Sequence, residues 1–257
     1  MATTRTRDQA DHDTSRRPLG GRFVGSAANY LDERTSISGL MKELGRKVFP
    51  DHWSFMLGEI ALWAFVVVFI TGTFLTFFFQ ASMVPTHYTG AYAPMRGMEM
   101  TAAFDSALRI SFDIRGGLLV RQMHHWAALV FVAGIGLHML RVFFTGAFRK
   151  PRELNWVIGF LLFILAMAEG FTGYSLPDDL LSGNGLRIID GMIKGLPLIG
   201  TWTSFLLFGG EFPGTDIIGR LYTLHILILP MLVIALIALH LILMIVNKHT
   251  QFAGPGR

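Results

Sequence analysis

The chain has 257 residues, of which 52% are hydrophobic and only 16% are charged, and its mean hydropathy is +0.48. A water-soluble domain usually carries about a quarter charged residues, so this composition indicates a membrane protein. The chain contains no cysteine, which excludes disulfides, thiolate metal sites and iron–sulfur clusters within it. The net charge of +4 does not indicate nucleic-acid binding, because the basic residues stand beside apolar segments.

The first part of the chain is polar. Residues 1–25 carry several arginines with no apolar stretch directly after them, which predicts a disordered cytoplasmic tail rather than a cleaved signal peptide. Residues 26–47 mix apolar and charged positions at helical spacing, which predicts an amphipathic helix on the inner membrane surface. We assign residues 26–257 to a single domain.

Four long apolar segments follow, and each is long enough to cross the hydrocarbon core of a bilayer, which is about 30 Å thick. They are expected near residues 54–79, 122–145, 155–176 and 221–247. The predicted fold is therefore an all-α membrane protein, a four-transmembrane-helix bundle preceded by a surface helix.

The distribution of lysine and arginine sets the expected orientation. Fifteen of these residues lie before the first segment, at the end of the second or between it and the third, or after the fourth, whereas seven lie in the other two connections. Cytoplasmic connections carry the excess of positive charge, so both termini are predicted to be cytoplasmic and the protein multi-pass. The second and fourth helices then run in the same direction, from outside to inside.

The connection between the third and fourth segments is unusually long. Glycine and proline interrupt apolar pieces such as LRIIDGMIKGLPLIG in this connection. Long ordered loops often carry function. We expect this connection to fold back as short helices on the outer surface.

Four histidines provide the most specific signal. They form two pairs, His124 and His138 on the second apolar segment and His225 and His240 on the fourth. These intervals keep each pair on one broad face of its helix and place its members roughly 21–22 Å apart along the axis. Because the two helices run in parallel, His124 is expected to pair with His225 near the outer face. His138 is expected to pair with His240 near the inner face.

Such pairs can hold two haems one above the other, with a histidine on each side of each iron. Ionisable residues are costly inside a membrane, and four of them matched in depth are hard to explain by packing alone. The alternative for a single histidine is a core residue with satisfied hydrogen bonds. Other metals fit poorly, because no carboxylate or thiolate accompanies the histidines at the same depth.

Arginines and glycines near these histidines extend the hypothesis. Arg121, Arg141 and Arg220 stand where haem propionates would end, although anchoring at the membrane edge explains them equally well. Glycines on the first and third segments recur at the interval that separates His124 from His138, which indicates room for a flat macrocycle at two depths. These glycines are Gly58, Gly72, Gly159 and Gly173. Ordinary small-residue helix packing is the alternative.

These residues resemble cytochrome b of the quinol–cytochrome c reductases, from about residue 30 to the end of the chain. The matching motifs are RQMHHW at 121–126, HMLR at 138–141, GYSLP at 173–177, PLIG at 197–200 and RLYTLH at 220–225. Pro230 matches a family proline that would kink the fourth helix. The interval between His225 and His240 resembles the chloroplast type, and the tail KHTQFAGPGR resembles the Gram-positive bacterial menaquinol type.

The resemblance implies a respiratory subunit in the plasma membrane that contains two haem b groups. Quinol, which the subtype implies to be menaquinol, would be oxidised at the outer face and quinone reduced at the inner face, with protons moved across the membrane. The implied partners are a Rieske iron–sulfur protein, a c-type cytochrome, membrane lipid and a second copy of the complex. Histidine at both axial positions suits electron transfer without oxygen binding.

The resemblance also places two quinone pockets. Tyr174, Gly185 and residues 180–193 fall on positions of the outer quinol pocket, but the family's LPW becomes Leu176-Pro177-Asp178 and a tryptophan becomes Asn184. The inner pocket would lie near the start of the first segment and the end of the fourth. Lys248 and His249 are candidates there, with a surface role as the alternative.

Two acidic residues lie inside apolar segments. Glu169 is costly in the third segment unless it is paired or protonated, and we leave open a proton relay or a hydrogen bond to a neighbouring helix. Glu59, near the inner end of the first segment, is interpreted as an interfacial residue with satisfied hydrogen bonds.

The chain ends soon after the last apolar segment, whereas full-length members of the resembled family continue with further helices and a Pro-Glu-Trp-Tyr-like motif. We therefore expect the C-terminal half of cytochrome b to be missing or a separate chain, and the isolated chain to lack quinol–cytochrome c activity. Two other functions remain possible from the sequence. One is a di-haem membrane anchor of a hydrogenase or formate dehydrogenase, and the other is a cofactor-free transporter or assembly protein.

Overall fold

The computed structural model describes residues 29, 30, 32, 52–209 and 214–247. The expected tail at 1–25, most of the expected surface helix at 26–47, and Lys248 and His249 lie outside the described residues. The chain divides into residues 1–49 and 50–257, and every element below belongs to the second unit.

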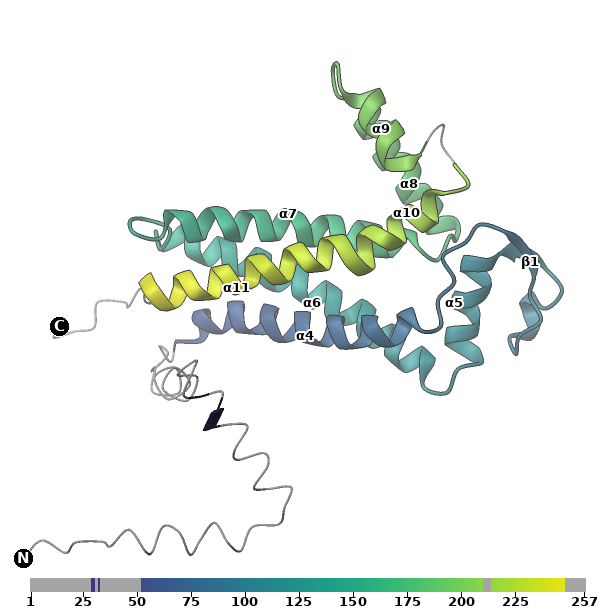
Figure 1. Ribbon diagram of the computed structural model, residues 1–257, viewed down its shortest axis with the longest axis horizontal. Helices are drawn as coiled ribbons and strands as arrows, with labels where there is room; N and C mark the ends of the chain where they lie inside the picture. The colour runs from purple at the N-terminus through teal and green to yellow at the C-terminus, as the bar shows by residue number, and fades with distance from the viewer. Residues whose placement is uncertain (1–28, 31, 33–51, 210–213, 248–257) are drawn as a thin grey trace, which may run out of the picture. The chain divides into compact units, whose positions relative to one another are not determined.

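Four long helices form the body of this unit (Figure 1). The first three are α4 (Met56–Thr76), which follows a short 3₁₀ turn η1 (Trp53–Phe55), α6 (Gly117–Phe144) and α7 (Glu153–Ser175). The fourth is a continuous span made of α10 (Ile217–Thr223), the π-helical segment η3 (Leu224–Ile228) and α11 (Leu229–Asn247). All four are long and apolar enough to cross a membrane, which confirms the predicted all-α membrane fold.

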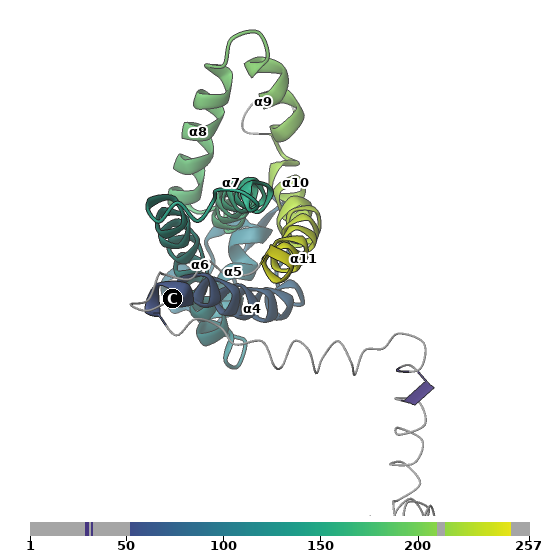
Figure 2. The ribbon, with the colours of Figure 1, turned by 90° about the vertical axis from the view of Figure 1, so that its left-hand side faces the viewer.

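The four helices associate as two pairs, seen end-on in Figure 2. Helix α4 packs chiefly along α6, and α11 packs chiefly along α7. In the first pair, Ala61 and Ala64 of α4 lie in one buried cluster with Phe131 of α6. In the second pair, Val233 of α11 is buried in a cluster with residues of α7. Each pair contains one glycine-bearing helix and one histidine-bearing helix.

Helix α6 begins at Gly117, earlier than the predicted segment. Gly116 precedes it with φ of 76°, a left-handed conformation that glycine adopts without steric cost. A side chain on Gly117 would collide with the backbone carbonyl of Ile110. The two glycines therefore allow a tight corner between α6 and the helix before it.

The connection between α4 and α6 contains elements that the sequence analysis did not anticipate. A short antiparallel pair joins β1 (Pro85–His87) to β2 (Glu99–Thr101), with the 3₁₀ turn η2 (Ala93–Met95) between them. Helix α5 (Ala102–Phe112) follows directly, and the Thr101 hydroxyl caps it by accepting a bond from the Phe104 backbone N–H. Arg109 of α5 lies 2.7 Å from the Asp105 carboxylate, an ion pair between neighbouring turns of the helix.

The connection between α7 and α10 folds into the short helices α8 (Leu180–Lys194) and α9 (Gly200–Phe208), as expected. The two helices project from one end of the bundle in Figures 1 and 2. The buried Asp190 of α8 joins them, because it accepts hydrogen bonds from Ser204 of α9 and from Lys194.

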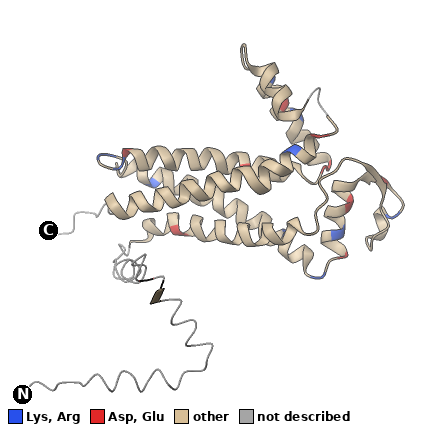
Figure 3. Ribbon diagram, in the orientation of Figure 1, with Lys and Arg blue, Asp and Glu red and all other residues tan. Residues whose placement is uncertain are grey.

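Charged residues avoid the long helices. Figure 3 shows the bundle almost entirely free of coloured charged segments along its length, with blue and red concentrated at its ends and in the connections. A spanning helix buries its side chains in hydrocarbon, where charge is costly, so this distribution agrees with four membrane crossings.

Candidate functional site

The structure brings the four histidines together in two pairs. The imidazole rings of His124 and His225 have centroids 6.2 Å apart and planes inclined at 80°. The rings of His138 and His240 are 6.4 Å apart and inclined at 78°. A metal–histidine bond is about 2 Å long. Two such bonds and half of each ring account for separations of this size, so each pair has the spacing for one metal between two histidines.

His124 is held by helix α4. Its Nδ1 atom lies 3.1 Å from the carbonyl oxygen of Val68 and 3.0 Å from the hydroxyl oxygen of Thr71. The Thr71 hydroxyl donates to the Val67 carbonyl at 2.6 Å, so its oxygen is free to accept from the imidazole. Hydrogen-bond acceptors at Nδ1 fix the orientation of a metal-binding histidine and leave its Nε2 atom to the metal.

His225 is held by helix α7 in the same way. Its Nδ1 atom lies 3.1 Å from the carbonyl oxygen of Glu169 and 3.3 Å from the hydroxyl oxygen of Thr172. The sequence separations are also identical to those around His124, 56 residues to the carbonyl and 53 to the hydroxyl. The two halves of the bundle thus repeat one local arrangement. The sequence analysis did not identify the two threonines as partners of the histidines. A threonine directly before each glycine, Thr71-Gly72 and Thr172-Gly173, was the available signal.

The pair His138 and His240 has fewer polar contacts. The Nδ1 atom of His138 is buried and has no hydrogen-bond partner among the described residues. Within the same part of the chain, the Nε atom of Arg141 and the Oδ1 atom of Asn155 are also buried without a partner. These polar atoms have capacity for hydrogen bonds that the described protein atoms do not use.

Each of the four predicted glycines lies against one of these imidazole rings on the neighbouring helix. The facing pairs are Gly58 with His138, Gly72 with His124, Gly159 with His240, and Gly173 with His225. A methyl group on the first three glycines would come within 3.0–3.4 Å of the ring, and on the fourth it would overlap the ring. The absence of side chains therefore lets each imidazole approach the glycine-bearing helix closely.

The π-helical segment η3 accounts for the unequal histidine intervals. It includes His225 and ends two residues before Pro230, which has no N–H to donate to an α-helical hydrogen bond. A π turn takes up one residue more than an α turn. The rings of His225 and His240 thereby lie on the same side, although their interval is one residue longer than that between His124 and His138 in the regular helix α6. The predicted proline effect therefore takes the form of a π turn.

The three predicted arginines have different surroundings. Arg121 donates to the Ser111 hydroxyl at 2.8 Å, and Arg220 donates to the Leu206 carbonyl at 3.0 Å. The guanidinium of Arg141 stacks over the Phe55 ring, 3.9 Å from its centroid. Arg220 also lines a groove of about 1060 Å³ at the α8–α9 end of the bundle, together with residues from 81–85, 206–207 and 215–228. All three lie near a histidine pair in sequence, and Arg141 has unused hydrogen-bonding capacity.

Tyr174 and Gly185, the two residues expected at an outer quinol pocket, lie close together. A methyl group on Gly185 of α8 would be 3.7 Å from the Tyr174 ring at the end of α7. The Tyr174 side chain is half exposed. The two residues therefore border one surface where α7 turns into α8.

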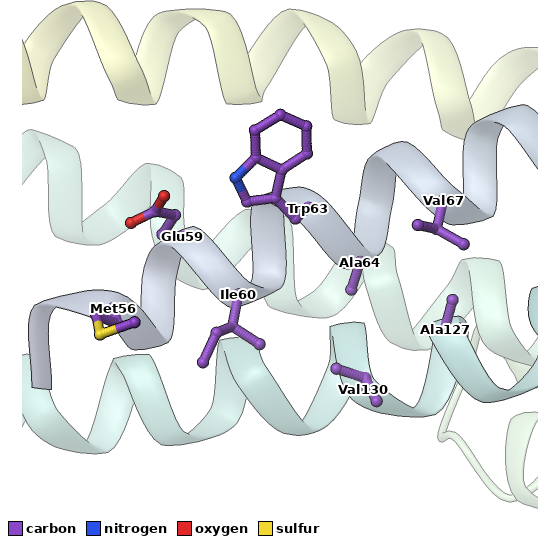
Figure 4. A pocket seen from close by; sticks show the side chains of 8 residues that line it. All are labelled: Met56, Glu59, Ile60, Trp63, Ala64, Val67, Ala127 and Val130. Carbon is purple, nitrogen blue, oxygen red and sulfur yellow. The ribbon is translucent and has the colours of Figure 1, made fainter. Parts of the chain in front are cut away.

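The two acidic residues of the spanning helices have different positions. Glu169 lies beside His225, with Oε1 3.4 Å from its Nδ1 atom, so the expectation that no carboxylate accompanies the histidines at the same depth is wrong for this pair. Glu59 is exposed and borders a groove of about 430 Å³ between α4 and α6, whose other lining residues are all apolar (Figure 4). None of the four histidines lines this groove, so it is separate from the histidine pairs.

The chemistry of the donor set fits haem better than a bare ion. Each site offers two histidines, whereas a structural metal ion usually takes four protein ligands. No group of three or more His, Asp or Glu side chains in the described ranges is arranged to hold a metal ion. A haem iron needs only the two axial ligands from the protein, because its macrocycle supplies the equatorial nitrogens. The close-facing glycines let the histidine rings of each pair lie against the neighbouring helices.

Comparison with known proteins gives a consistent result. Residues 129–257 match the family described as cytochrome b (N-terminal)/b6/petB. The chain is 58% identical over 230 residues to the cytochrome bc1 complex cytochrome b subunit of Streptomyces coelicolor, covering 90% of this chain and 42% of the relative. It is 60% identical over 241 residues to the subunit of the same name from Mycobacterium bovis, covering 93% of this chain and 44% of the relative.

A solved structure is also similar. A chain of a hyperthermophilic respiratory Complex III superposes with a TM-score of 0.69 and 26% sequence identity, covering 86% of this chain and 55% of that chain. The present chain thus spans less than half the length of the curated relatives that it matches.

Proposed function

Because the chain belongs to the cytochrome b (N-terminal)/b6/petB family, we propose that it is the two-haem part of the b subunit of a respiratory quinol–cytochrome c reductase. Its role is to conduct electrons across the membrane, from quinol oxidised at the outer face to quinone reduced at the inner face. The observation that carries this proposal is the set of two facing histidine pairs, with ring centroids 6.2 and 6.4 Å apart.

His124 and His225 would hold the outer haem b, and His138 and His240 the inner haem b. When bound, haem iron would supply a one-electron carrier, and two histidine ligands would suit it to electron transfer. The chain's own residues orient the ligands: the glycines let the imidazole rings lie close to the facing helices, and the Val68 and Glu169 carbonyls hold the outer histidines through Nδ1. The unused Nε atom of Arg141 suits a haem propionate at the inner site.

We place the outer quinol pocket at the surface that Tyr174 and Gly185 border. Its support is their proximity and the match of both residues to the family's pocket. The inner quinone pocket would lie near the start of α4 and the end of α11. His249 and Lys248 are its candidate residues. Menaquinone is the quinone class that fits the resemblance to the Gram-positive type.

Orientation and partners follow from the same argument. The excess of lysine and arginine supports cytoplasmic termini. The resemblance to the Gram-positive type supports the plasma membrane as the location. A Rieske iron–sulfur protein and a c-type cytochrome would accept electrons at the outer face, within a dimeric complex. The sequence that the longer relatives possess in addition would complete the outer quinol site.

The test is a reduced-minus-oxidised absorption spectrum of the protein in its membrane, with haem quantified against protein. We expect two b-type haems per chain. Replacement of His124 or His225 should remove one of them, and replacement of His138 or His240 should remove the other. A folded, colourless protein would refute the proposal and favour a transporter or an assembly protein. Co-purification with a hydrogenase in place of a Rieske protein would favour the membrane-anchor function.

A further inference from the structure

One of the differences between the two halves of the bundle lies directly beside the outer histidines. Val68 on α4 and Glu169 on α7 hold equivalent places, since each gives its backbone carbonyl to a histidine Nδ1 atom at 3.1 Å. Both are also followed by the threonine and glycine of the repeated arrangement. Only Glu169 adds a side chain that can interact with the histidine. At this place in the repeat, His225 therefore has a carboxyl group beside it and His124 has none.

The Glu169 side chain is directed at His225. Its Oε1 atom lies 3.4 Å from the His225 Nδ1 atom, and both side chains are largely buried, with 19% and 15% of their surface exposed. The Oε2 atom is buried and has no hydrogen-bond partner in the part of the chain that the structure describes. A carboxyl group in an apolar helix is costly. Its orientation toward a histidine on the neighbouring helix indicates a role at that residue rather than at the lipid surface.

We propose that Glu169 is a positioning residue for the outer haem, acting through the Nδ1 atom of His225. The carboxyl oxygen near Nδ1–H adds to the carbonyl and hydroxyl acceptors that both outer histidines have, and it makes the imidazole of His225 a stronger donor to iron through Nε2. Stronger donation stabilises the oxidised iron, so Glu169 lowers the reduction potential of the outer haem. Val68 leaves His124 without this contribution, and the two ligands of the outer haem are therefore unequal. This inference rests on the proposed two-haem function.

The test is a redox titration of the two haems, followed by their absorption spectra in membranes that contain the protein. Glu169→Val copies the residue of the other half and should raise the potential of the outer haem only. The expected shift is at least tenfold in its reduced-to-oxidised ratio, or ~59 mV for one electron. Glu169→Gln keeps an acceptor oxygen of similar shape and should give a smaller rise. Glu153→Gln, an exposed acid at the start of α7, is the control and should change neither potential.

The reciprocal variant Val68→Glu places a carboxyl group beside His124 and should lower the potential of the outer haem. If Glu169→Val does not take up haem, the potentials of the outer haem in Val68→Glu and Glu169→Gln test the inference instead. The inference is overturned if the variants retain both haems with unchanged potentials, or if both haems shift equally. A wild-type protein without haem would refute the proposed function as well, so the two failures are distinguishable.

Discussion

The hydroxyl oxygen of Thr71 lies 3.0 Å from the Nδ1 atom of His124, across the contact between α4 and α6. Its own proton goes to the Val67 carbonyl, so the oxygen acts as an acceptor for the imidazole. Thr172 repeats this relationship with His225 at 3.3 Å. The threonines therefore join each outer histidine to the helix that faces it.

Loss of this hydroxyl should weaken the outer site. We expect Thr71→Val to lower the affinity for the outer haem by about 10–100-fold, the usual effect of removing a partner of a metal ligand. The inner haem should be unaffected. Haem titration of the apoprotein measures both sites. Thr73→Val is the matched control, because the Thr73 hydroxyl is exposed and bonds to the Phe69 carbonyl of its own helix.

Addition of a methyl group at the glycines should have opposite effects at different positions. Alanine normally stabilises a helix by about 0.5–1 kcal/mol relative to glycine. At Gly72 the methyl group would press on His124, so we expect Gly72→Ala to displace that ring and lower the occupancy of the outer haem. Gly58→Ala should do the same at the inner haem through His138.

Gly136 and Gly170 supply the controls for this prediction. Among the described residues, nothing lies within 4 Å of a methyl group at either position, and both are in long helices. Gly136→Ala and Gly170→Ala should therefore retain both haems and raise the thermal stability. Equal loss of haem in all four variants would show that the glycines serve general helix packing rather than the approach of the histidines.

Hydropathy, charge distribution and residue spacing were sufficient to predict the four helices. The signal is strong because each helix must be apolar over its whole length. The β1–β2 pair and α5 were not predicted, because such short strands and a single short helix carry little periodicity. The contacts of Thr71 and Thr172 connect helices far apart in the sequence. The only signal for them in the sequence was the threonine that directly precedes Gly72 and Gly173.

The π-helical segment illustrates a second limit. The longer interval between His225 and His240 is visible in the sequence, but it is compatible with a rotated histidine or with a locally wider helix. Pro230 predicts a distortion of the fourth helix but does not distinguish between these two alternatives. Hydrogen bonding decides between these alternatives, and the Leu229 N–H bonds to the Leu224 carbonyl in the π pattern.

The junction of α8 and α9 should depend on pH through Asp190. Burial opposes ionisation of this residue, but hydrogen bonds from Lys194 and Ser204 outweigh it and hold the pKa of the Asp190 carboxyl below its usual value. The folded-state pKa is lower than the unfolded one, so the stabilisation is complete above the unfolded value. It is lost as the pH falls through the folded value.

Hydrogen exchange of the α8 and α9 amides can measure this effect. We expect protection to be constant near neutral pH and to decline below about pH 4, where an ordinary aspartate begins to bind protons. Asp190→Asn should lower the protection at neutral pH and abolish its dependence on acid. Asp216→Asn, at an exposed aspartate without a side-chain cap bond, should leave the profile of the wild type unchanged.

Deletion of one residue tests whether η3 takes up the extra residue between His225 and His240. Removal of Leu227, which is half exposed, would make their interval equal to that between His124 and His138 and allow a regular α-helix. Both histidines would stay on one face, so we expect both haems to be retained. Removal of Leu129, similarly exposed in the regular helix α6, would rotate His138 by about 100° relative to His124.

The second deletion should therefore cost one haem, because α6 has no wide turn that can absorb the change. Haem content per chain and the spectra of the two sites distinguish these outcomes. If removal of Leu227 also cost a haem, the π turn would do more than absorb the extra residue between His225 and His240. It would then be required to hold His225 in place.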